Sequence, residues 1–172
     1  MKHFNIIIVA FLSVTLGACT QLRPLTSELK QEYGWSETEL KKIQFYVSDD
    51  IVLQRTFSGG KTAIDKGKVV VVDGKKIEQV IIPKNTPGVL LFMPESDKLA
   101  VSFEGKGEDK FLMFGPNPHY GNRYQLLGAK WEKNKGIITY DGNKYMVNAS
   151  AAFTNLMIDM KQIKDYEKKS RR

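Results

Sequence analysis

The sequence contains one cysteine and two histidines, and beyond its first eighteen residues it has no long apolar run. Because Cys19 is the only cysteine, the chain can form no internal disulfide and must be held together by packing. His119 is the only histidine outside those eighteen residues, which excludes a zinc site built from several histidines and leaves no spare cysteine nucleophile. We therefore predict no metal, no cofactor and no catalytic residues.

The N-terminus has the layout of an export signal. Met1, Lys2 and His3 form a short positive region, and an apolar run follows from Phe4 to about Val14. This run has about a dozen residues, whereas a helix that crosses a bilayer core needs roughly 20. We therefore predict a signal peptide over residues 1–18 instead of a permanent membrane span.

Leu16, Gly17, Ala18 and Cys19 close this segment and resemble the lipobox of bacterial lipoprotein precursors. The resemblance implies cleavage after Ala18 and a diacylglyceryl thioether on Cys19, which would anchor the mature protein to a membrane. Thr20 stands where aspartate would resemble an inner-membrane retention signal, so we expect the outer membrane, with the domain facing the periplasm or the cell surface. The whole chain resembles small envelope lipoproteins of Gram-negative bacteria, a resemblance that supplies no catalytic residues.

Composition predicts one domain, because 172 minus 18 leaves about 154 residues, enough for a core. We expect a lipidated tether over 19–35, a β domain over 36–161 and a basic tail over 162–172. Without Lys2, 25 basic residues face 19 acidic ones, a net charge of +6 that favours anionic partners such as lipid headgroups or wall polymers. We expect no nucleic-acid partner. The tail could dock on such a surface or remain a solvated end.

The pattern of the mature chain is that of an all-β, mainly antiparallel protein. Ser36 three residues before Glu39 predicts a capping box and a short helix over 37–42. Short runs rich in valine, isoleucine and aromatic residues then recur about every ten residues. They predict strands at 43–48, 51–57, 68–72, 76–82, 88–93, 98–104, 110–114, 124–131, 136–140 and 144–148. Such a series favours a small barrel or sandwich.

Two turns and one alternating run refine this expectation. Asp73-Gly74 and Asp141-Gly142 predict tight hairpins, because a type I′ turn needs positive φ at both central residues. Leu99, Val101 and Phe103 alternate with smaller residues, which predicts one buried and one wetter face. The segment 82–89, followed by a hairpin ending at 101–104, resembles part of an SH3-like barrel. Residues 152–166 fit both a helical and a strand period, and a strand over 155–161 would cover a sheet edge.

Several apparent motifs do not carry the chemistry that they imitate. Gly59-Gly60-Lys61-Thr62 ends like a phosphate-binding loop, but Arg55 replaces the required first glycine and strand signals follow. Asp49-Asp50 and the acids Glu104, Glu108 and Asp109 lack the spacing of a calcium loop and fit solvated turns. Hydrolysis by two carboxylates stays open, since any two acids could meet in space.

The most suggestive stretch is the loop over 116–124, in which prolines and glycines surround His119, Tyr120 and Arg123. These side chains could bind an anionic or sugar-like ligand, or the loop could only shape a wide turn. Two functions follow. The first is a tethered interaction or structural module that binds an envelope protein or wall polymer. The alternative is a domain that binds, or weakly hydrolyses, a small ligand at this loop.

Overall fold

A computed structural model describes residues 21–56, 68–72, 75–104 and 110–164. Several sequence-based predictions fall outside these residues: the signal peptide and Cys19, the Gly59–Thr62 stretch, the Asp73-Gly74 turn, Glu108 and Asp109, and the chain end from residue 165 onward.

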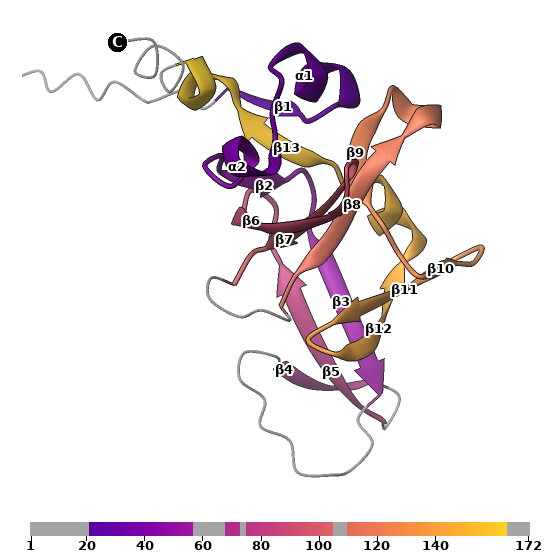
Figure 1. The fold of residues 1–172 in the computed structure, drawn as a ribbon. Helices are drawn as coiled ribbons and strands as arrows, with labels where there is room; N and C mark the ends of the chain where they lie inside the picture. The colour runs from indigo at the N-terminus through magenta and orange to yellow at the C-terminus, as the bar shows by residue number, and fades with distance from the viewer. Residues whose placement is uncertain (1–20, 57–67, 73–74, 105–109, 165–172) are drawn as a thin grey trace, which may run out of the picture.

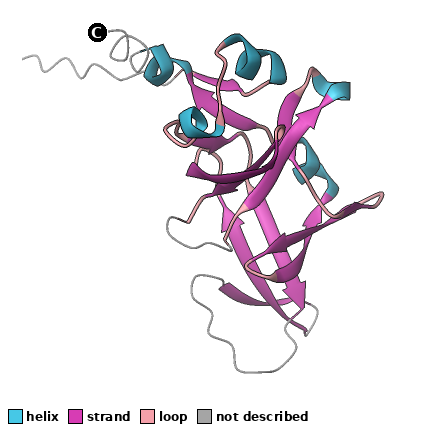
Figure 2. Ribbon diagram, in the orientation of Figure 1, coloured by secondary structure: helices cyan, strands magenta, loops and turns pink. Residues whose placement is uncertain are grey.

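The described chain forms two antiparallel sheets (Figures 1 and 2). The first has the order β1 (Leu22–Pro24), β13 (Leu156–Asp159), β2 (Phe45–Val47), β6 (Pro87–Glu95), β7 (Lys98–Ser102), β8 (Leu112–Asn117) and β9 (Arg123–Leu126). The second has the order β10 (Lys130–Trp131), β11 (Lys135–Tyr140), β12 (Asn143–Asn148), β3 (Ile51–Thr56), β5 (Lys75–Ile82) and β4 (Lys68–Val72). The all-β, mainly antiparallel prediction is confirmed in its sandwich-like form.

Between β1 and β13 the described residues form four short helical segments: α1 (Ser27–Glu32), α2 (Glu37–Leu40), η1 (Pro118–Tyr120) and η2 (Ala149–Phe153). The first sheet curls until single bridges join β9 to Thr26 and to Asn155. Among the described residues no strand ladder completes this closure, so neither sheet forms a closed barrel.

One apolar core serves both sheets. Phe45 and Phe114 of the first sheet and Ile51 and Leu53 of the second are all fully buried and belong to the same cluster. β2 and β3 are separated by only three residues, and β5 and β6 by four, so the long β3–β5 pair extends directly from the first sheet (Figure 1). The apolar inner faces therefore meet without a linker between two units.

Two local predictions are confirmed. Asp141 and Gly142 have φ values of 49° and 66°, and they join β11 to β12 with Tyr140 opposite Asn143. The Glu39 carboxylate accepts a hydrogen bond of 3.0 Å from the Ser36 backbone N–H and thereby caps α2.

The predicted tether over 19–35 is wrong from Gln21 onward. β1 pairs with β13, and Leu25 is fully buried. Thr26 caps α1 by accepting the Leu29 N–H at 3.1 Å, and Leu29 and Tyr33 pack against the core. Leu29 and Tyr33 are four residues apart, so they lie on one side of α1 and its C-cap. Leu25 reaches the core from the extended segment before α1, where its backbone bonds to Leu156 and Tyr124.

Two strand predictions also need correction. The expected strand over 124–131 is two strands in different sheets, because the chain crosses between the sheets at 127–129. The Leu127 N–H donates to Met113 on one side of this crossing, and the Ala129 N–H donates to Ile137 on the other. β7 is buried on both faces: Ala100 is small and lies between the larger Phe92 and Met113 of the neighbouring strands.

The last described residues form a strand followed by a helical turn, the two structures that their sequence pattern allows. Residues 156–159 form β13, as the strand prediction expected, and residues 160–164 are helical. Met160 and Ile163 of this helical turn are buried in the core. The domain therefore continues past residue 161, and the predicted basic tail over 162–172 starts too early.

Because Leu25 is part of the core, we expect Leu25→Ala to lower the free energy of unfolding by about 2–5 kcal/mol, the cost of a buried cavity. Urea unfolding followed by circular dichroism measures this loss. The control is Ile81→Ala on an exposed strand position, for which we expect a change of about 0.5 kcal/mol or less. Equal stability of the Leu25→Ala variant and the wild type would restore the tether interpretation.

Candidate functional site

The structure places the three predicted ligand-binding residues at one tight connection. β8 and β9 pair with Asn117 opposite Arg123, so the expected wide loop is a hairpin end formed by η1 and two left-handed residues, Gly121 and Asn122. Asn117 shapes this turn: its side-chain oxygen accepts the His119 N–H at 3.1 Å, and its carbonyl accepts the Asn122 N–H at 3.0 Å.

His119, Tyr120 and Arg123 are all exposed at this hairpin end. The Tyr120 ring packs edge-on against Phe153 of η2, with ring centroids 5.1 Å apart, and both rings remain about half exposed. The three side chains are therefore brought together on one turn, but they are presented to solvent and are not enclosed by the core. Ligand binding by this loop stays a prediction.

A buried amide fixes the same hairpin to the rest of the domain. Gln125 is 4% exposed and accepts the Asn117 side-chain N–H at 2.9 Å. Its own amide N–H groups donate to the Asn155 side-chain oxygen at 3.1 Å and to the Phe153 carbonyl at 3.4 Å. Both ends of the amide are thus used, and Gln125 acts as a structural link between β9 and the segment before β13.

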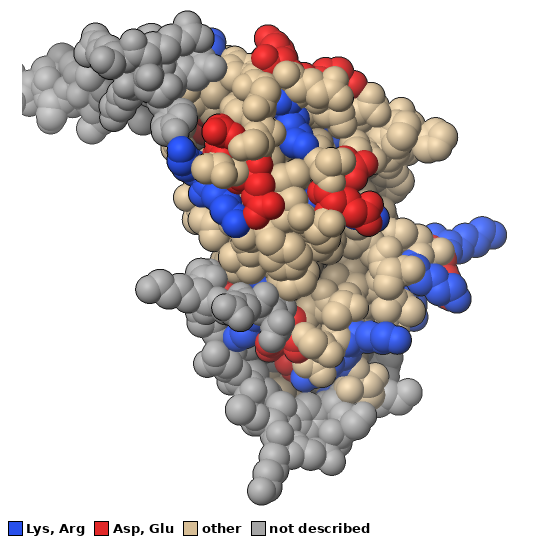
Figure 3. Space-filling view, viewed as in Figure 1, with Lys and Arg blue, Asp and Glu red and all other residues tan. Residues whose placement is uncertain are grey.

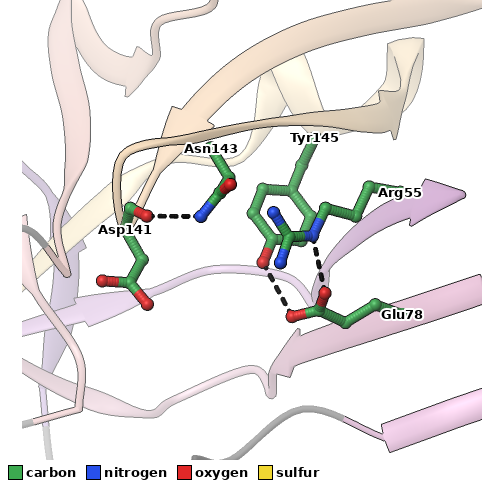
Figure 4. A network of polar contacts seen from close by, with 5 residues as sticks. All are labelled: Arg55, Glu78, Asp141, Asn143 and Tyr145. Carbon is green, nitrogen blue, oxygen red and sulfur yellow. Dashed lines mark hydrogen bonds and ion pairs between the residues drawn. The ribbon is translucent and has the colours of Figure 1, made fainter. Parts of the chain in front are cut away.

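The second sheet holds a polar network that the sequence analysis missed (Figure 4). Arg55 Nε of β3 lies 2.6 Å from Glu78 Oε2 of β5, and the Tyr145 hydroxyl of β12 donates to Glu78 Oε1 at 3.0 Å. The Arg55 guanidinium also lies over the Tyr145 ring, 5.1 Å from its centroid. Glu78 and Tyr145 are both buried.

We call Arg55, Glu78 and Tyr145 the brace, because the electrostatics of this network fit a structural role better than a catalytic one. Burial, followed by the hydrogen bond to Glu78, raises the pKa of Tyr145 to about 12. Burial, followed by the negative charge of Glu104, raises the pKa of the neighbouring Tyr140 far above its usual value. Both hydroxyls therefore stay protonated at neutral pH, and both Glu78 oxygens already have partners. The arrangement offers neither a general base nor an activated nucleophile.

A sequence signal for the brace existed. Ile51 and Leu53 point into the core and Arg55 continues their alternation. Glu78 likewise stands two residues before the buried Val80, which is followed at the same spacing by the buried Ile82. A cation and an anion at inward positions of two strands predict a buried pair when the strands are neighbours. The pairing itself, Arg55 opposite Glu78, depends on a register that the sequence does not reveal.

The acidic turns that the sequence analysis considered have local roles. Asp50 accepts the Lys84 N–H at 2.6 Å, Asp49 accepts the Ser48 hydroxyl at 2.6 Å, and Glu104 lies 3.8 Å from the Lys110 ammonium. Within the described ranges no group of three histidine, cysteine, aspartate or glutamate side chains could hold a metal ion.

The outward face of the second sheet differs from the inner face that packs on the core. Its strand register places two exposed apolar side chains, Ile81 at 45% and Met146 at 43% exposure, on this side. Half-buried Val52 and Ile137 extend the apolar surface. We define the outward face by the described positions of β3, β5, β11 and β12 on this side: Val52, Gln54, Thr56, Ile77, Gln79, Ile81, Lys135, Ile137, Thr139, Lys144, Met146 and Asn148.

None of these twelve positions is acidic, and two are exposed lysines, Lys135 and Lys144. Figure 3 shows basic side chains (blue) projecting from the region of β10, β11 and β12. At the adjacent sheet edge Lys130 lies 2.7 Å from Glu132, so its charge is balanced locally. The outward face therefore combines apolar side chains with positive charge.

Comparison of the chain with protein-family models, with curated proteins and with solved structures finds no match. The part of the chain that the structure describes also contains no helix long and apolar enough to cross a membrane.

The brace makes a prediction for alkaline solution. In the unfolded chain a tyrosine ionises near pH 10, whereas in the folded protein the pKa of Tyr145 is about 12. The stability linked to this hydroxyl is complete below pH 10 and is lost as the pH rises toward 12. Tyr145→Phe should make the loss of stability with rising pH less steep, and at neutral pH it should cost about 1.5–3 kcal/mol, because the lost hydrogen bond goes to a buried carboxylate.

Urea unfolding at several pH values between neutrality and pH 12 measures both effects. Tyr120→Phe, which changes an exposed hydroxyl, is the matched control and should leave the pH dependence unchanged. If Tyr145→Phe and Tyr120→Phe behave alike, the hydroxyl of Tyr145 does not brace the sheet.

Proposed function

We propose that this protein is an envelope lipoprotein, anchored through lipid on Cys19, that serves as an interaction module. The lipobox at the end of an export signal supports the anchor, and the outer membrane is the expected location, with the domain facing the periplasm or the cell surface. Several acyl chains on one cysteine would make release from the membrane negligible, since a single chain already binds marginally and each buried methylene adds about 0.8 kcal/mol.

The observation that carries the interaction role is the outward face of the second sheet. Ile81 and Met146 are large apolar side chains exposed on the same face as Lys135 and Lys144, and no described position of that face is a carboxylate. Exposed apolar surface favours a protein partner over a hydrated wall polymer, and the lysines favour acidic residues around the partner's apolar contact. The partner class that we propose is an envelope protein with this pattern.

The anchor predicts the behaviour of a single variant. Cys19→Ala should leave the domain folded, because the described fold begins after this residue, but it should remove the protein from the membrane fraction. Fractionation of source cells followed by immunoblotting measures the distribution, and circular dichroism of the purified variant checks the fold. Ser27→Ala, which keeps the lipobox, is the control and should remain membrane-bound. Membrane retention of Cys19→Ala equal to the wild type would refute the lipid anchor.

The outward face predicts where crosslinking will capture a partner. A photoreactive amino acid at Met146 of the acylated protein should give one discrete protein adduct in intact source cells. The same group at Thr38, exposed on α2, should not give it. Ile81→Asp should abolish the Met146 adduct by placing a negative charge in the contact. Mass spectrometry identifies the adduct.

Three outcomes of this experiment would count against the proposal. Capture of a wall fragment from Met146 would replace the protein partner by a polymer. Identical adducts from Met146 and Thr38 would mean that the captured protein is only an abundant neighbour. The absence of any adduct from Met146 would remove the outward face as the contact and return attention to His119, Tyr120 and Arg123.

A further inference from the structure

The fold brings the two ends of the described chain together. β1 pairs with β13 so that Leu22 lies opposite Asp159, and the Met160 N–H donates to the Gln21 carbonyl at 3.2 Å. Figure 1 shows β1 and β13 side by side at the end of the molecule that is farthest from β4. The first described residue and the start of the last helical turn are therefore hydrogen-bonded neighbours.

Covalent geometry ties this end to Cys19. Gln21 is held by Met160, and Cys19 precedes it by two residues, a reach of about 7 Å at full extension. An acyl group on Cys19 inserted in a bilayer would consequently hold Gln21 close to the lipid headgroups. With such an anchor, the folded domain would lie next to the membrane surface, because the fold already begins at residues 21–25.

The same end carries positive charge. Arg23 of β1, and Lys161 and Lys164 of the helical turn, are exposed. Asp159, two residues before Lys161, is buried and accepts the Lys161 backbone N–H at 2.9 Å, and Asp165 follows Lys164 directly in the sequence. The neighbouring α1 carries two exposed acids, Glu28 and Glu32, and a hydrogen bond from Asn122 lowers the pKa of the Glu28 carboxyl. The sequence after residue 164 adds four basic and two acidic residues.

We propose that this end, defined by Arg23, Lys161 and Lys164, is a second membrane contact that binds the anionic phospholipid headgroups around the Cys19 lipid. The inference rests on the lipid anchor proposed above. Basic residues beside a lipid anchor strengthen attachment because each one near an anionic surface adds its own attraction. The contact would also fix the orientation of the domain, with the second sheet directed away from the bilayer.

The charge contribution can be measured without the acyl chains. We expect the mature chain with Cys19→Ser to cosediment with vesicles containing phosphatidylglycerol and not with phosphatidylcholine vesicles. Adding Lys161→Ala and Lys164→Ala should weaken the partition coefficient about 25-fold, since each cation near such a surface contributes about fivefold. Lys135→Ala with Lys144→Ala removes the same charge from the outward face and should change it less than about twofold. Circular dichroism confirms that both pairs fold.

Equal binding to both kinds of vesicle, or equal losses from the two lysine pairs, would overturn the proposed contact. Binding to isolated wall polymer but not to vesicles would overturn it as well. The anchor is tested separately, by mass spectrometry of the protein purified from source cells. An unmodified Cys19 would refute the anchor, independently of the result of the vesicle experiment.

Orientation is tested in the acylated protein. Because the thioether would occupy the only native cysteine sulfur, one introduced cysteine is the sole free thiol and can carry a fluorophore. A quencher attached to lipid headgroups should quench a label at Gln162→Cys and leave a label at Asn148→Cys unaffected. Both positions are exposed and uncharged, so neither substitution alters the charge. Equal quenching at the two positions would contradict the proposed orientation.

Discussion

Burial of one apolar core without any covalent crosslink is the constraint on which the rest of the structure depends. Cys19 is the only cysteine and lies outside the described fold, so apart from the backbone connections only noncovalent contacts join the two sheets. Fully buried side chains such as Phe45, Leu53 and Phe114 each contribute about 2 kcal/mol by leaving water. The inner face of the second sheet must therefore be used for packing, and only its outward face is free for a partner.

The Arg55–Glu78–Tyr145 brace shows how polar residues fit within that constraint. Glu78 is buried, and an isolated carboxylate there would be costly, but a guanidinium and a phenol each satisfy one of its oxygens. The brace links three strands, β3, β5 and β12, of which β12 and β3 share only the pairing of Met146 with Gln54. Side-chain contacts thus support the sheet where its backbone ladder is short.

The sequence predicts those elements that are determined by residues close to one another in the chain, such as turns and helix caps. The Asp141-Gly142 turn and the α2 capping box depend on neighbours in the sequence, and both are present. The sequence does not predict that residues 21–35 belong to the fold, because they contain few apolar positions and their strand pairs with the distant β13. The Arg55–Glu78 pair and the crossing at 127–129 depend on which strands become neighbours, and that information is spread over the whole chain. His119, Tyr120 and Arg123 share one hairpin end because they are close in sequence, and ligand binding by them stays a prediction.

The pairing of Leu22 with Asp159 has a consequence for how the domain is made. Its first strand finds its partner only after nearly all of the chain is present, and contacts between such distant residues are reached late and slowly. A chain with this topology cannot complete its fold until the segment that forms β13 is available to pair with β1. In the export that we propose, the domain would therefore close only after nearly the whole chain has crossed the membrane.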